Sequence, residues 1–202
     1  PALGRVTIKL PAGVYTNTHG SGAYGSGALV ANADVTIIGE GADKTILTVD
    51  PSIRDRVLFV AGAGVTLSDV TIRGGQSPTD TQKGGGIRST GSLAIINSLI
   101  TQNSDGGIAS ERWLIIWNTA IVQNNDVGLI LSGEGGVVVN ATFSGNPQNI
   151  QNAGALLLNN VTLNSPAEPG TTSIATSGQV NSRDTLITGM GSCAVSGAGA
   201  IT

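Results

Sequence analysis

An aliphatic side chain recurs along this chain at intervals of about two dozen residues, and this recurrence limits the folds open to it. The positions are Leu29, Leu58, Ile87, Ile108, Leu129, Ile150, Ile174 and Val195, separated by 29, 29, 21, 21, 21, 24 and 21 residues. Such a period is typical of solenoids, in which each unit buries its apolar side only against its neighbours. We therefore interpret residues 1–202 as a single solenoid domain.

Within each repeat, short segments of alternating polarity predict strands. The segments 92–103 and 113–124 align with each other, and 137–146 and 156–163 continue the series. They are too short and too rich in glycine and asparagine for helices. Three strands in each coil predict an all-β parallel β-helix with three sheets and about seven or eight coils. The first sheet runs through Ile87, Ile108 and Leu129, the second through Ile95, Ile116 and Val138, and the third through Ile100, Ile121 and Phe143. We expect Ile108, Leu129, Ile116, Ile121 and Phe143 to be almost fully buried.

Asparagine or aspartate stands between the second and third predicted strands of most coils. The series is Asn97, Asn118, Asn140 and Asn160, with Asp69 before it and Asp184 after it. A sharp corner needs a residue with positive φ, and after glycine these two types tolerate it best. Stacked amides can also hydrogen-bond from coil to coil, which predicts a structural asparagine ladder. Asn103, Asn124 and Asn146 predict a second, shorter ladder.

This pattern resembles the right-handed parallel β-helix of the pectate-lyase-like superfamily over nearly the whole chain. Segments 8–15 and 35–41 are similar to the first coils of secreted β-helix proteins of that kind. The resemblance implies an extracellular or cell-surface protein. It does not fix an activity, because the superfamily includes enzymes, adhesins and phage proteins.

Composition argues against two classes of partner. The net charge is −3, and the ten Lys and Arg residues are scattered, so no basic surface for nucleic acid is expected. No apolar run approaches the roughly 20 residues that span a bilayer, so we expect no membrane insertion. Cys193 is the only cysteine, so no internal disulfide forms.

Longer insertions at 16–27, 50–56, 73–85 and 164–172 all interrupt the turn from the third sheet back to the first. In solenoids such insertions gather on the functional face, and the superfamily's lyases and hydrolases work in a groove beside the first sheet. Asp50, Arg54, Asp55 and Arg88 are therefore the candidates for a lyase, with an arginine as base and carboxylates holding Ca²⁺. However, the outward neighbours of the first aliphatic series include no carboxylate, whereas a glycosidase needs two acids about 5–10 Å apart. We favour a protein without catalytic residues, metal or cofactor, and keep a polysaccharide-binding or polysaccharide-cleaving β-helix as the alternative.

Alternation also places an unusual set of side chains on the outer face of the second sheet. The set is Ile96, Trp113, Ile115, Trp117, Val137, Val139 and Leu157. A solvated face would alternate to polar residues, as Thr66 and Ser68 do earlier on the same sheet. An apolar patch of this kind marks an interaction surface, and we interpret it as an interface with a second copy of the chain. The alternatives are a segment of this chain folded across the patch and a sugar-stacking platform.

The ends of the chain predict a further contact. Strand-like sequence begins within a few residues of Pro1, and the last coil stops at 198–202 without a charged or helical cap. Solenoids need polar caps, because a terminal coil exposes unpaired strand edges. We expect either a fragment or processed form of a longer secreted chain, or a subunit that stacks end to end. The sequence thus favours an extracellular structural or adhesive protein, such as a filament or surface-layer subunit, with glycan contact as a further option.

Overall fold

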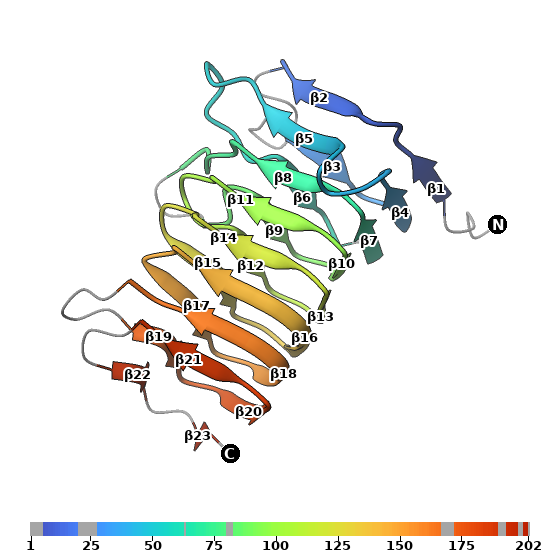
Figure 1. Ribbon diagram of the computed structural model, residues 1–202. Coiled ribbons are helices and arrows are strands. Elements are labelled where there is room, and N and C mark those ends of the chain that lie inside the picture. Colours follow the sequence, from blue (N-terminus) through green and yellow to red (C-terminus); the bar gives the residue numbers. More distant parts are fainter. Residues whose placement is uncertain are drawn as a thin grey trace.

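The chain forms a parallel β-solenoid (Figure 1). The computed structural model describes residues 6–19, 28–62, 64–79, 83–166, 172–189, 193–197 and 200–201. These residues contain strands joined by turns and bends and no helix. In particular, no helix long and apolar enough to cross a membrane occurs among them. The predicted all-β class and parallel solenoid are confirmed.

Strands of successive turns stack side by side in two hydrogen-bonded sheets, one of 8 and one of 15 strands. The first sheet consists of β3 (Leu29–Ala31), β6 (Leu58–Val60), β9 (Ile87–Ser89), β12 (Ile108–Ser110), β15 (Val127–Leu131), β17 (Gln148–Asn152), β19 (Thr172–Thr176) and β22 (Cys193–Ser196).

The larger sheet bends along a corner into two arms. The second arm contains β1 (Val6–Lys9), β4 (Val35–Ile38), β7 (Gly64–Ser68), β10 (Ser92–Ile96), β13 (Leu114–Trp117), β20 (Gln179–Arg183) and β23 (Ala200–Ile201). The third arm contains β2 (Gly13–Asn17), β5 (Thr45–Val49), β8 (Thr71–Arg73), β11 (Leu99–Thr101), β14 (Ala120–Val122) and β21 (Leu186–Thr188). Two long strands run through both arms, β16 (Gly135–Ser144) and β18 (Ala155–Asn164).

The register of the stack agrees with the periodicity of the sequence. Leu29 pairs with Leu58, and the same column continues residue by residue to Ile174 and Val195. The columns through Ile116 and Ile121 also pair as expected. The five predicted core residues, Ile108, Leu129, Ile116, Ile121 and Phe143, are each 0% exposed. In the middle turns, inward aliphatic and aromatic side chains therefore build a continuous core, whereas Leu29, near the N-terminal end of the stack, is 46% exposed.

The corner between the two arms is made by the predicted asparagine series. Asp69, Asn97, Asn118, Asn140, Asn160 and Asp184 all have positive φ, between 49° and 59°. The amides of the four asparagines form a ladder in which Asn118 Nδ2 donates to Asn97 Oδ1 at 2.9 Å, Asn140 Nδ2 to Asn118 Oδ1 at 2.9 Å, and Asn160 Nδ2 to Asn140 Oδ1 at 3.0 Å. At the start of the ladder, Asn97 Nδ2 donates to Asp69 Oδ1 at 3.2 Å. Both predicted roles, the turn and the ladder, are confirmed.

The prediction of three separate sheets is wrong at this corner. In the earlier turns the residue after the ladder asparagine carries a hydroxyl, which accepts a backbone N–H from the preceding turn. Ser98 Oγ accepts from Val70 N at 3.3 Å, and Thr119 Oγ1 accepts from Ser98 N at 3.3 Å. These bonds replace backbone pairing and interrupt the strands. Ala141 and Val161 have no hydroxyl and pair with each other through the backbone, so the two arms merge into one sheet.

The number of turns also differs from the prediction. The solenoid makes about six turns, slightly fewer than the seven or eight coils expected. Its outermost turns are incomplete within the described residues, since β1 and β2 follow no described first-sheet strand and β23 precedes no described third-arm strand.

A second ladder of asparagines lies inside the turn from the third arm to the first sheet. Asn103, Asn124 and Asn146 are 0% exposed. Asn103 Nδ2 donates to Asn124 Oδ1 at 3.0 Å, and Asn124 Nδ2 donates to Asn146 Oδ1 at 3.1 Å. The same oxygens accept the backbone N–H groups of Asn103 and Asn124. This buried ladder satisfies polar groups that the turn would otherwise leave unpaired inside the protein.

Candidate functional site

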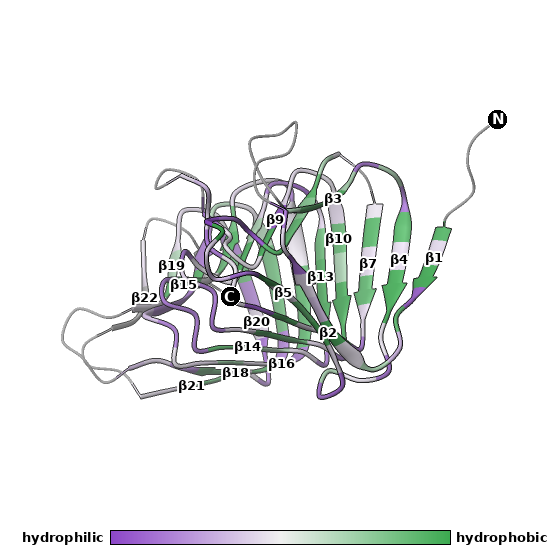
Figure 2. Ribbon diagram, turned by 90° about the horizontal axis from the view of Figure 1, so that it is seen from above, coloured by the Kyte–Doolittle hydropathy of each residue, from purple (hydrophilic) through white to green (hydrophobic). Residues whose placement is uncertain are grey.

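The outer face of the second arm carries the apolar set expected from the sequence, here called the second-arm patch: Ile96, Trp113, Ile115, Trp117, Val137, Val139 and Leu157. Two rows cross neighbouring turns. One joins Ile115 to Val137 and Leu157, and the other joins Ile96 to Trp117 and Val139. Trp113 immediately precedes β13. Figure 2 shows β1, β4, β7, β10 and β13 side by side, with hydrophobic residues along each strand.

Four members of the patch are unusually exposed for their type. Trp117 is 55% exposed, Trp113 and Leu157 are each 41% exposed, and Ile115 is 37% exposed. The other three members are partly buried. With tryptophan side chains of about 150–250 Å², the patch leaves on the order of 400 Å² of apolar surface in contact with solvent. That is the size at which an apolar patch on a monomer is often functional.

Polar groups border the patch on two sides. Next to Trp113, Arg112 Nη1 and Glu134 Oε1 form an ion pair of 2.7 Å between neighbouring turns, and both side chains are more than half exposed. Beyond Leu157, a hollow of about 370 Å³ is lined by polar residues that include Asn181 and Arg183. An apolar centre with a polar, solvated rim is the usual anatomy of a protein interface.

Three of the candidate catalytic residues, Asp50, Arg54 and Arg88, contact different partners. Asp50 accepts hydrogen bonds from the hydroxyl of Ser52 at 2.6 Å and from its backbone N–H at 2.9 Å, and these bonds hold the pKa of Asp50 below its ordinary value. Arg54 Nε donates to the backbone oxygen of Ser77 at 3.1 Å. Arg88 Nη2 forms a 2.6 Å ion pair with Glu111 Oε1 on the next turn.

Asp55 lies in a buried cluster instead of an open groove. It is only 1% exposed and accepts the backbone N–H of Arg56 at 2.7 Å. The guanidinium of Arg56 lies 5.6 Å from the centre of the Phe59 ring. Burial, reinforced by the nearby charge of Arg88, lowers the pKa of Arg56, while Asp55 opposes the shift. A carboxylate enclosed in this way is positioned to stabilise the loop 50–57, not to meet a polymeric substrate.

The outer row of the first sheet consists of Phe59, Arg88, Ala109, Ile130, Gln151 and Ala175. As expected, it contains no carboxylate between β6 and β19. Within the described part of the chain, no three His, Cys, Asp or Glu side chains come together in a way that could hold a metal ion.

The insertions do leave the solenoid where the sequence places them, between the third arm and the first sheet. Residues 20–27, 80–82 and 167–171 of these insertions lie outside the described residues. So do residues 1–5, 198–199 and 202, on which the expectation about the chain ends depends.

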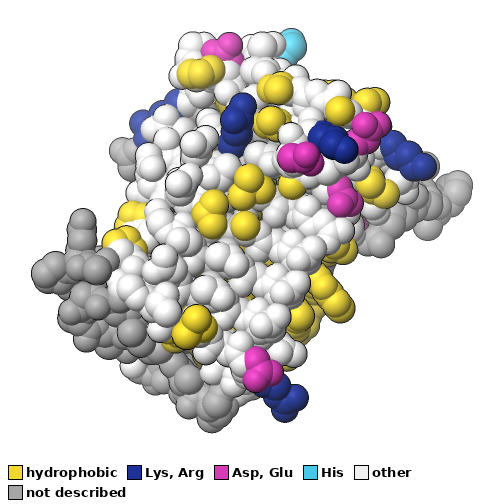
Figure 3. All heavy atoms as spheres, in the orientation of Figure 1, with side chains coloured by type: hydrophobic (Ala, Val, Ile, Leu, Met, Phe, Trp, Pro, Cys, Tyr) yellow, Lys and Arg dark blue, Asp and Glu magenta, His cyan; other side chains and the backbone are white. Residues whose placement is uncertain are grey.

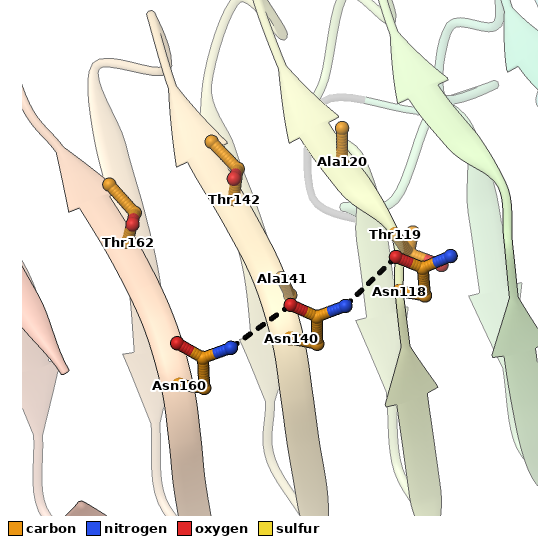
Figure 4. Close-up of a pocket in the computed structure, with 8 residues that line it drawn as sticks. All are labelled: Asn118, Thr119, Ala120, Asn140, Ala141, Thr142, Asn160 and Thr162. Carbon is orange, nitrogen blue, oxygen red and sulfur yellow. Dashed lines mark hydrogen bonds between the residues drawn. The ribbon is translucent and has the colours of Figure 1, made fainter. Parts of the chain in front are cut away.

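Sequence reasoning missed a second surface, a shallow groove along the asparagine corner. It has a volume of about 300 Å³ and is lined by Asn118, Thr119, Ala120, Asn140, Ala141, Thr142, Asn160 and Thr162. Figure 4 shows the amide ladder at one side of the groove. Two residues further along the chain from each ladder asparagine, Ala120, Thr142 and Thr162 form a parallel row. The signal was present in the sequence, because each ladder asparagine is followed two residues later by one of these three side chains.

We found no protein-family model, no curated protein and no solved structure that matches this chain.

Proposed function

We propose that this protein is a non-enzymatic, extracellular structural or adhesive subunit that associates with a second copy of itself through the second-arm patch. The observation that supports this proposal is the exposure of both tryptophans, one at the end of β13 and one immediately before it. Trp113 and Trp117 are 41% and 55% exposed. Tryptophan is among the residues that most often dominate the binding energy of protein interfaces.

A second copy suits this surface for a geometric reason. Side chains on the patch repeat at the strand spacing of about 4.8 Å from turn to turn. The same face of a second solenoid carries rows with the same spacing, so the two sets of side chains can interdigitate when the sheets pack face to face. A twofold axis through the patch brings each row against its own copy, as in most homodimers.

The available area also fits a dimer. A stable interface buries about 800 Å² on each partner, of which more than half is apolar. The roughly 400 Å² of exposed apolar surface would supply the centre. The Arg112–Glu134 pair and the polar residues beyond Leu157 would supply the rim.

We further propose that the chain belongs with the pectate-lyase-like β-helix proteins and acts outside the cell. The support is the resemblance of segments 8–15 and 35–41 to the first coils of secreted members, together with the parallel solenoid. Among these proteins a structural role is favoured here over cleavage, because Asp55 is enclosed and Arg88 is paired with Glu111.

Light scattering coupled to size-exclusion chromatography tests the proposed assembly. At micromolar concentration the wild-type chain should elute with twice its mass of 20.2 kDa. Trp117→Glu should elute with the single-chain mass and keep its far-UV circular dichroism spectrum, because the side chain points outward and the core is unchanged. Leu186→Glu is the matched control. Leu186 is similarly exposed, at 58%, but lies on the third arm, so this variant should remain dimeric.

Three results would overturn the proposal. They are a monomeric wild type across the concentration range, an unchanged mass for Trp117→Glu, and an equal loss of mass for Leu186→Glu. Release of reducing ends or unsaturated products from acidic polysaccharides, abolished by Arg88→Ala or Asp55→Ala, would instead favour the enzyme.

A further inference from the structure

The groove along the asparagine corner has hydrogen-bonding groups that the fold leaves unused. In the ladder, Asn140 donates one N–H of its amide to Asn118 and accepts one bond from Asn160. An amide has two N–H donors and two acceptor lone pairs. Asn140 therefore keeps one donor and one acceptor for an external partner. Asn118, Asn140 and Asn160 are all exposed.

Of the three threonines that line the groove, Thr142 and Thr162 add free hydroxyls, and Thr119 does not. Thr119, which faces inward, donates to the backbone oxygen of Trp117 at 2.9 Å. Thr142 and Thr162 face outward in one row and make no side-chain hydrogen bond within the described part of the chain. Figure 4 shows both side chains on the same side of the sheet as the ladder amides. Amide and hydroxyl groups thus repeat together from turn to turn.

None of the eight residues that line the groove is charged. Figure 3 shows that the face formed by β14, β16 and β18 is mostly uncharged, with Lys, Arg, Asp and Glu side chains concentrated towards its margins. An anionic ligand would find no cation in this groove, and a cationic ligand would find no carboxylate. The chemistry favours a neutral ligand whose groups both donate and accept.

We propose that this groove binds a neutral, extended polysaccharide laid along the solenoid axis. Sugar hydroxyls donate and accept at the same time, which matches the unused groups of the ladder amides and of Thr142 and Thr162. The groups repeat from turn to turn at about 4.8 Å along the solenoid axis. A linear polymer can therefore contact several rungs at once, and such repeated weak contacts raise the overall affinity.

This site is distinct from the second-arm patch and from the edge beside the first sheet. It lies at the corner and on the third arm, so binding to it can be measured separately from dimerisation. Adhesion to a neutral glycan and self-association would then use different faces of the same rod.

Affinity electrophoresis in native gels tests the proposal. The gels contain hydroxyethylcellulose or galactomannan as neutral probes, or polygalacturonate as an anionic comparison. The wild type should be retarded by at least one neutral probe and not by polygalacturonate. The double variant Thr142→Val/Thr162→Val keeps side-chain shape and strand propensity but removes both hydroxyls. It should bind about tenfold more weakly, because two hydrogen bonds are lost.

The matched control is Thr36→Val/Thr66→Val, the same change on two neighbouring turns of the second arm. It should bind like the wild type, and so should Trp117→Glu. The proposal is overturned if no neutral probe retards the wild type, if polygalacturonate retards it more strongly, or if the two double variants behave alike. Loss of binding in Trp117→Glu would place the sugar on the second-arm patch and would likewise overturn it.

Discussion

Replacing Phe143 with alanine removes the largest fully buried side chain among the described residues. The ring lies in a column between Ile121 on the preceding turn and Leu163 on the following turn. Both neighbours belong to hydrogen-bonded strands, which prevent the column from collapsing into the vacated space. The substitution should therefore leave most of the cavity open.

The expected loss of stability can be estimated from two contributions. Removing the buried ring forfeits about 1.5–3 kcal/mol of transfer free energy. A residual cavity of roughly 100 Å³ costs about 2.4 kcal/mol more, at ~24 cal/mol per Å³. The sum, about 4–5 kcal/mol, lies at the upper end of the ~3–5 kcal/mol found for such substitutions. The free energy of unfolding of an ordinary domain is about 5–15 kcal/mol, so the variant would still fold. If the wild type lies near the lower end of that range, the variant would be only marginally stable.

Urea denaturation followed by far-UV circular dichroism measures this loss from the shift of the midpoint at constant m. Protein concentration must be held fixed, because association stabilises the folded state by mass action. Thr142→Val, on the adjacent outward position of β16, is the control and should change the free energy of unfolding by less than about 0.5 kcal/mol. A loss below about 1 kcal/mol for Phe143→Ala would refute the stacked core described here.

The two asparagine ladders give further predictions for the same assay. Asn118→Ala loses two ladder bonds and places alanine at positive φ, so it should lower the free energy of unfolding by about 2–3 kcal/mol. Asn118→Gly loses the same bonds but should lower it less, because glycine accepts this conformation. Equal losses for the two variants would contradict the role given to backbone conformation. Asn124→Leu deprives the buried amide and backbone N–H of Asn103 of their shared acceptor. It should therefore cost on the order of 3 kcal/mol or more, and a stable Asn124→Leu variant would show that water or rearrangement replaces this ladder.

Much of the fold follows from the sequence because each turn obeys the same local rule. An aliphatic residue such as Ile108 or Ile116 must face inward on every strand, and a one-residue slip would expose it. The same alternation, applied to Trp117, correctly places it outside. Periodicity thus predicts both the core and the second-arm patch.

Periodicity alone was not enough to predict the merged corner or the groove. Whether the arms form one sheet depends on one side chain per turn: Ser98 and Thr119 accept a backbone N–H, and Ala141 and Val161 do not. The spacing of Thr142 and Thr162 after the ladder asparagines is visible in the sequence, but only the structure shows that their hydroxyls line a groove. Likewise, the sequence places Asp55 in an insertion between two strands, and only the packing of loop 50–57 encloses that carboxylate.

The amide ladder at the corner has a direction. Every asparagine donates to the turn before it, and the series ends at the carboxylate of Asp69, which can only accept. A turn inserted between Asn97 and Asn160 with its own corner asparagine would keep every donor matched to an acceptor. An inserted turn with aspartate at that position would break the series. Evolution could therefore lengthen or shorten this rod in whole turns of about 4.8 Å, without redesigning any turn already present.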